Sequence, residues 1–157
     1  MESHLLQLQW LLIHPIHQKM LETSIHQERS IMNEGRLILL VDDEQTVRNM
    51  LRSALEMRGY EVVDAGNGVQ ALGLFVKHQS KIAAVITDIT MPAGGGVELA
   101  RQLAEKRPDI PILFVSGICD ELPNDLRAYG CIQKPFSAPA IPEEIAKIIA
   151  PPQSQRW

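Results

Sequence analysis

The sequence predicts an α/β domain over residues 36–150, in which helices cover both faces of a five-stranded, doubly wound parallel sheet. Short apolar runs, of the kind expected for strands buried on both faces, alternate with segments whose apolar residues recur at helical spacing. Alternating strands and helices imply right-handed crossovers and hence a parallel sheet. The polar residues that carry chemistry follow directly after the apolar runs. The chain shows no internal repeat and no second domain.

The first half of the fold begins with the apolar run at 37–41, which ends abruptly in acidic residues. The next segment has a helical pattern and stops at Arg58-Gly59. A short strand is expected at 60–63, and Asn67 is a good N-cap for the helix after it. The third strand is expected at 82–87. In the first helix the apolar residues that recur at helical spacing are Val47, Met50, Leu51, Ala54 and Leu55. The second helix is expected to carry Val69, Leu72, Phe75 and Val76 inward.

The second half opens with a turn that contains Gly94-Gly95-Gly96, and the helix after it is stopped by Pro108. Strands are expected at 110–115 and 131–133. Pro142 suits the first turn of a last helix, which ends before Pro151-Pro152. The inward-facing side chains are Val97, Ala100, Leu103 and Ala104 in the third helix, and Ile145, Ile148 and Ile149 in the last.

The two ends of the chain lie outside this pattern. Residues 1–35 are rich in Gln, His and Leu and have no strand signal, although Leu5, Leu8 and Leu12 could line one face of a short helix before Pro15. Three interpretations stay open: a disordered arm, a helical arm that packs on a partner, or a translation start placed too far upstream of Met32. Residues 151–157 are expected to form a C-terminal tail.

Composition and charge exclude several classes of protein. Of the 157 residues, 45% are hydrophobic and 22% charged, which is typical of a soluble globular domain. The net charge of -4 argues against direct binding of nucleic acid. No stretch is long and apolar enough for a membrane span, and the start of the chain is a poor signal peptide. We therefore expect a cytoplasmic protein, with Cys119 and Cys131 as reduced thiols.

Polar residues follow the strands at the edge where parallel sheets place their functional groups. Asp42 and Asp43 follow the first expected strand, Asp88 the third, Ser116 the fourth and Lys134 the fifth. Taken singly, each is an ordinary turn, helix-terminus or surface residue. Because all of them belong to the same edge of one sheet, we expect three carboxylates, a hydroxyl and an amine to meet in one crevice.

The expected crevice has the chemistry of a phosphoryl-transfer site. Three neighbouring carboxylates require a compensating cation, and an oxygen-only ligand set suits Mg²⁺. A carboxylate such as Asp88 can attack phosphorus and form an acyl phosphate. Mg²⁺ and the Lys134 ammonium would neutralise charge, while the Ser116 hydroxyl would hold one phosphoryl oxygen.

The motifs Val41-Asp42-Asp43-Glu44, Asp88-Ile89-Thr90-Met91-Pro92, Ser116-Gly117 and Lys134-Pro135-Phe136 together resemble those of response-regulator receiver domains. The resemblance covers about residues 36–150 and implies the flavodoxin-like receiver fold. It implies that Asp88 takes a phosphoryl group from a histidine kinase or a histidine phosphotransfer protein in a two-component phosphorelay. It also implies that Asp43, Asp88 and the Thr90 carbonyl bind Mg²⁺ directly, and that Asp42 does so through water. Such a domain catalyses only its own phosphorylation and dephosphorylation and signals by protein contact.

The chain departs from the family pattern at two places. Cys131 stands where receiver domains commonly carry Tyr or Phe, three residues before the lysine. The segment between Ser116 and Lys134 is short and contains Pro123, which predicts a stunted or irregular fourth helix. Neither departure removes a residue that phosphorylation needs. Thr90 and Ile118, two residues beyond Asp88 and Ser116, are poor bases toward water, so slow self-dephosphorylation is expected. The alternative function is a receiver-shaped interaction module that acts without phosphorylation.

Overall fold

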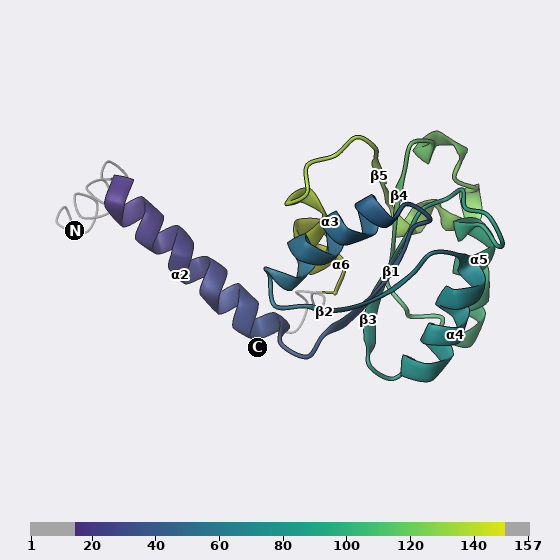
Figure 1. Ribbon diagram of the computed structural model, residues 1–157, viewed down its shortest axis with the longest axis horizontal. Helices are drawn as coiled ribbons and strands as arrows, with labels where there is room; N and C mark the ends of the chain where they lie inside the picture. The colour runs from purple at the N-terminus through teal and green to yellow at the C-terminus, as the bar shows by residue number, and fades with distance from the viewer. Residues whose placement is uncertain (1–14, 150–157) are drawn as a thin grey trace.

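The computed structural model describes residues 15–149 of the chain and shows a single parallel sheet with helices on both sides (Figure 1). The strands are β1 (Leu37–Val41), β2 (Glu61–Ala65), β3 (Ile82–Thr87), β4 (Ile112–Ser116) and β5 (Cys131–Gln133). Their order across the sheet is β2-β1-β3-β4-β5, and every neighbouring pair is parallel. The predicted five-stranded, doubly wound architecture is confirmed.

Two strands begin and end later than their apolar runs suggested. The second was expected at 60–63, but β2 covers Glu61–Ala65 because the Tyr60 amide donates to the Leu55 carbonyl at the end of the preceding helix. The fourth was expected at 110–115, but β4 covers Ile112–Ser116. The Ile110 backbone amide donates to the Arg107 carbonyl in a turn, and Pro111 has no N–H that could pair with a neighbouring strand.

Each face of the sheet carries its own apolar core. Helices α3 (Gln45–Glu56) and α6 (Ala140–Ile149) cover one face, and α4 (Gly68–His78) and α5 (Gly96–Lys106) cover the other (Figure 1). β1 supplies both cores in alternation, with Ile38 and Leu40 facing α3 and Leu37, Leu39 and Val41 facing α4. All five β1 residues are buried, as expected of a central parallel strand.

The inward face of α4 differs from the predicted one. Phe75 is fully buried as expected, but Val69 and Val76, which were also expected in the core, are 70% and 57% exposed. Ala71, which was not expected there, is fully buried. At Gly68, the first residue of α4, an added Cβ would lie 2.5 Å from the Gly94 carbonyl oxygen. Backbone therefore packs on backbone at the start of α4, and the face that contains Gly68, Ala71 and Phe75 turns toward the sheet.

The connection between β4 and β5 confirms the stunted fourth helix. It contains two short 3-10 helices, η1 (Cys119–Glu121) and η2 (Asn124–Tyr129), with Pro123 at the N-cap of η2. Leu122 and Leu126 are buried against the same core as α4 and α5, so the segment is packed despite its irregular backbone.

The expectation of two reduced thiols is wrong, because Cys119 and Cys131 form a disulfide. Cys119 opens η1, three residues beyond Ser116, and Cys131 opens β5, three residues before Lys134. The parallel pairing of β4 with β5 brings the two ends of the connection together, and the Cα atoms of the two cysteines are 5.8 Å apart. That separation is within the range that a disulfide can bridge.

The N-terminal arm is helical over the part that the structure describes. α2 (Pro15–Asn33) begins at the proline that the sequence suggested as an interruption, and proline is well tolerated in a first helical turn. The side-chain amide of Asn33 (Nδ2) donates to the Arg58 carbonyl at 2.9 Å and links the end of the arm to the domain. Leu5, Leu8, Leu12 and the tail at 151–157 lie outside the described residues. Within 15–149, no helix is long and apolar enough to cross a membrane.

Tyr60 carries a buried hydroxyl that makes no hydrogen bond within the described part of the chain. Replacing Tyr60 with Phe removes this unpaired polar group and should raise the free energy of unfolding by about 1 kcal/mol at neutral pH. Burial raises the pKa of Tyr60 above its usual 10.0, against the opposing charges of Arg36 and Arg58. The unfolded chain therefore ionises first, and the native protein loses stability as the pH rises above about 10.

The Tyr60→Phe variant has no such group to ionise. The difference between its free energy of unfolding in urea and that of the native chain should therefore increase from neutral to alkaline pH. The Tyr129→Phe variant is the control, because Tyr129 is the other tyrosine of the chain and is only partly buried. A Tyr60→Phe protein that is less stable than the native chain at neutral pH would contradict the prediction.

Candidate functional site

Two strand ends place their aspartates side by side at the carboxyl edge of the sheet. Asp42 follows β1 and Asp88 follows β3, and the last residues of these strands, Val41 and Thr87, are register partners. The Asp88 amide continues the ladder by donating to the Val41 carbonyl at 3.1 Å. Asp42 is 2% exposed and Asp88 9%, so both carboxylates are taken largely out of water.

The Lys134 ammonium joins these two carboxylates. Its Nζ lies 2.9 Å from Asp42 Oδ2 and 3.0 Å from Asp88 Oδ2. The Lys134 backbone amide donates to the Ser116 carbonyl at the end of β4, which places Lys134 at the same edge of the sheet. Burial in itself lowers the pKa of Lys134, but the hydrogen bonds and charges of Asp42 and Asp88 outweigh it and raise the pKa above its usual value.

Asp43 completes a cluster that fits a divalent cation. One carboxylate oxygen each from Asp42, Asp43 and Asp88 lies within 4.8 Å of the others, and Asp43 is exposed to solvent. Three carboxylates and one ammonium leave two negative charges, which one divalent ion balances. An all-oxygen set with an open, solvent-exposed side suits Mg²⁺, which keeps several of its waters. The donor set therefore fits the expected metal.

The remaining predicted residues, Ser116 and Thr90, border the cluster. Ser116 is buried at the end of β4, and its Oγ accepts from the Ile118 amide at 3.4 Å. Thr90 is exposed, and its amide donates to Asp88 Oδ1 at 3.3 Å. The structure thus brings Asp42, Asp43, Asp88 and Lys134 into direct contact or close proximity, with Ser116 at the end of β4 and Thr90 in the loop that follows β3.

The start of α5 lies directly against the backbone of Asp88. A Cβ added at Gly96 would lie 1.7 Å from the Asp88 carbonyl oxygen, so only glycine allows this approach. Thr87 Oγ1 also donates to that carbonyl at 3.0 Å. From the sequence the Gly94-Gly95-Gly96 run was assigned only to a turn before a helix, and the close backbone contact at Gly96 was missed.

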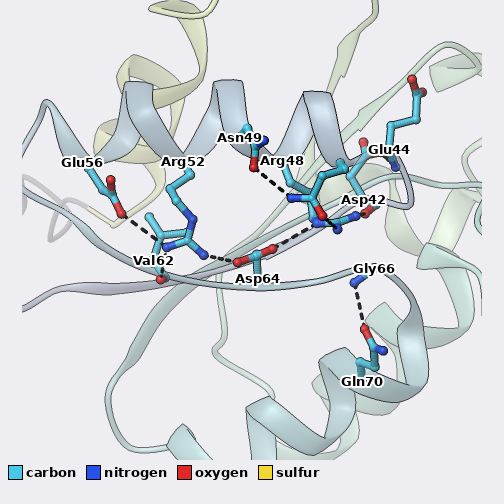
Figure 2. A network of polar contacts seen from close by, with 11 residues as sticks. Asp42, Glu44, Arg48, Asn49, Arg52, Glu56, Val62, Asp64, Gly66 and Gln70 are labelled. Carbon is cyan, nitrogen blue, oxygen red and sulfur yellow. Dashed lines mark hydrogen bonds and ion pairs between the residues drawn. The ribbon is translucent and has the colours of Figure 1, made fainter.

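A second omission is the polar network beneath Asp42, which Figure 2 shows. Arg48 and Arg52 of α3 both bind the Asp64 carboxylate of β2, and Arg48 Nη1 donates to the Asp42 carbonyl at 2.6 Å. Arg48 and Arg52 lie at helical spacing in the sequence, but nothing in it shows which acid they meet.

The arrangement is suited to covalent chemistry at one carboxylate. Asp88 presents a nucleophilic oxygen at the edge of a partly open site, and Lys134 already neutralises part of its charge. Phosphoryl transfer needs mainly positioning and charge neutralisation, which the cluster and the ammonium supply.

Comparison with known proteins gives one consistent family. The family model described as "Response regulator receiver domain" matches residues 38–146. Among curated relatives, the sensor kinase CckA of Brucella abortus is 39% identical over 105 residues, which are 64% of this chain and 11% of that protein. The response regulator receiver protein CpdR of the same organism is 33% identical over 119 residues, covering 71% of this chain and 95% of CpdR. The chain thus spans about a tenth of the first relative and nearly all of the second.

Solved structures agree with the sequence matches. A response regulator receiver domain protein from Clostridium thermocellum has a TM-score of 0.67 and 26% identity, covering 72% of this chain and 93% of that one. The response regulator TrrA from Thermotoga maritima, solved in complex with Mg(2+)-BeF, has a TM-score of 0.61 and 29% identity, covering 72% of this chain and 98% of that one.

Proposed function

Because this chain belongs to the response regulator receiver domain family, we propose that it is the phosphoacceptor of a two-component phosphorelay and that Asp88 carries the phosphoryl group. The observation that carries the proposal is the Lys134 ammonium, which bridges the Asp42 and Asp88 carboxylates beside the exposed Asp43. A lysine held between two acids at the carboxyl edge of a parallel sheet is suited to stabilise a pentavalent phosphorus centre that gains negative charge.

In the proposed reaction, one oxygen of the Asp88 carboxylate attacks phosphorus, and the bond from phosphorus to the nitrogen of the donor histidine breaks. Lys134 exchanges its contact with Asp88 for one with a phosphoryl oxygen and keeps its contact with Asp42. Ser116 donates its hydroxyl to another phosphoryl oxygen. Asp42, Asp43, Asp88 and the Thr90 carbonyl would hold Mg²⁺, which when bound neutralises the phosphoryl oxygens.

The proposed partners follow from this chemistry. The donor is a phosphohistidine on a histidine kinase or on a histidine phosphotransfer protein, and the place of reaction is the cytoplasm. The match to a sensor kinase and to a free-standing receiver protein supports a place in such a relay. The negative net charge supports output by protein contact and not by direct binding of nucleic acid.

The second candidate is an interaction module that never carries phosphate. The full-length protein is incubated with Mg²⁺ and acetyl phosphate, and its intact mass is measured with and without EDTA. A gain of one phosphoryl group that depends on Mg²⁺ supports the relay. An unchanged mass under both conditions rejects it and leaves the interaction module.

The acyl phosphate is expected to last for minutes or longer once the donor has been removed. Thr90 and Ile118 border the site, and neither side chain can act as a strong base toward water. Ile118 also packs against the apolar core on the α4 side of the sheet, which limits access of water from that loop. The measurement is the decay of the phosphorylated mass after rapid desalting. Loss of the phosphoryl group within seconds would contradict this expectation.

A further inference from the structure

The geometry points to Arg48 as a positioning residue for the metal site: it holds the peptide that joins Asp42 to Asp43 and so sets the direction of both acids. The inference rests on the proposed function, because it concerns the binding of Mg²⁺ to these carboxylates. Arg48 lies on α3 and makes no ion pair with the three clustered carboxylates. Its contact with Asp42 is a hydrogen bond to the backbone carbonyl (Figure 2).

The Arg48 guanidinium is fixed on three sides. Nε donates to Asp64 Oδ2 at 3.0 Å, Nη1 donates to the Asp42 carbonyl at 2.6 Å, and Nη2 donates to Gln45 Oε1. The side chain is 12% exposed, so little water competes for these bonds. A planar guanidinium with all three nitrogens engaged has one orientation available, and the Asp42 carbonyl must point at it.

That carbonyl belongs to the peptide plane between the two acids. The other side of Asp42 is fixed as well, because its amide donates to the Ala65 carbonyl at 3.2 Å and its Oδ1 accepts from the Glu44 amide at 2.9 Å. Asp43 is exposed, and among residues 15–149 its side chain has no hydrogen-bond partner. The orientation of its Cα–Cβ bond therefore follows from the Asp42–Asp43 peptide plane, which Arg48 holds.

Arg52 provides a built-in comparison. It lies one helical turn further along α3, binds the same Asp64 carboxylate through Oδ1, and donates to a β2 carbonyl, that of Val62, at 2.8 Å. It has no contact with Asp42. Loss of Arg52 therefore removes a similar link between α3 and β2 but leaves the acidic pair supported.

The two arginines also allow charge to be separated from positioning. Each substitution by Met removes one positive charge next to Asp64, and loss of a nearby cation should by Coulomb's law tighten the binding of Mg²⁺. If Arg48 acts by positioning, its removal should instead weaken the binding of Mg²⁺. Substitution of residues that orient metal ligands typically weakens metal binding by about 10-fold to 100-fold.

The native chain and the Arg48→Met and Arg52→Met variants are each titrated with Mg²⁺ alone, and binding is monitored by the NMR chemical shifts of the backbone amides. Urea unfolding in EDTA measures the stability of each. We expect the Mg²⁺ dissociation constant of Arg48→Met to rise about tenfold. That of Arg52→Met should stay the same or fall, although its stability drops to a similar extent.

The inference is overturned if Arg48→Met binds Mg²⁺ as tightly as the native chain or more tightly, or if both variants weaken binding equally. Should Arg48→Met fail to fold, Arg48→Lys and Arg52→Lys are judged by the same rule, because they keep the charge and lose the planar fork. A failure of the proposed function looks different: the native chain itself would then show no Mg²⁺-dependent phosphoryl uptake.

Discussion

Phosphoryl uptake from acetyl phosphate is expected to fall to zero in the Asp88→Asn variant. The carboxamide is isosteric with the carboxylate, but it is uncharged and does not form an acyl phosphate. Its oxygen can still accept from the Thr90 amide, and Lys134 keeps its contact with Asp42. The substitution also removes one of three clustered negative charges. The variant should therefore fold at least as well as the native chain while losing the reaction entirely.

The matched control is Asp109→Asn, the same chemical change at a residue whose side chain is 81% exposed and whose ion pair is with Arg107. Intact-mass measurements of both variants, with Mg²⁺ and donor, should show the phosphoryl group on the control alone. A full mass gain on Asp88→Asn would mean that another side chain carries the phosphate, and the assignment of Asp88 would fall.

The Gly96→Ala variant is expected to be destabilised and to lose phosphoryl uptake. A methyl group at this position would lie 1.7 Å from the Asp88 carbonyl oxygen and 3.0 Å from Thr87 Oγ1, both of which are buried. Because the obstacle is backbone, the start of α5 or the end of β3 must move. Overpacking of this kind costs about 3 kcal/mol, and here the displaced atoms include the backbone of the acceptor.

A glycine with open space around it gives the opposite expectation. Gly73 lies in the middle of α4, and an added Cβ would meet nothing within 4 Å. The Gly73→Ala variant should therefore gain about 1 kcal/mol from helix propensity and react normally. Urea unfolding and phosphoryl uptake are measured on both variants. A Gly96→Ala protein as stable and as reactive as the native chain would show that the contact at Asp88 is not tight.

Most of the site could be predicted from the sequence because a parallel sheet leaves few choices. Strands buried on both faces appear as plain apolar runs, so 37–41 and 82–87 were placed correctly. Residues that follow such strands share one edge, which is why Asp42, Asp88 and Lys134 were expected together and are found in contact. The short segment with Pro123 likewise predicted the irregular connection that η1 and η2 form.

The sequence-based prediction failed where a feature depends on contacts between segments that are far apart in the chain. On α4 the prediction was right for Phe75 and wrong for Val69 and Val76, because helical spacing does not show which neighbours of Phe75 turn inward with it. The close packing of Gly68 on Gly94 at the start of the helix has no signal in that spacing. The disulfide depends on the three-dimensional path between β4 and β5, not on the spacing of Cys119 and Cys131. Long polar side chains such as Arg48 have the same limit, because their partners come from another strand.

The helical arm has a consequence for how large partners approach. α2 has 19 residues, so it is roughly 28 Å long at 1.5 Å per residue, comparable to the width of the domain itself. It joins the amino end of β1, whereas the acidic cluster follows the carboxyl ends of β1 and β3, and it points away from the sheet in Figure 1. Under the proposed function, a docking protein that presents its histidine to Asp88 would therefore approach the end of the domain opposite to α2. A protein bound along α2 would therefore not block access to the acidic cluster.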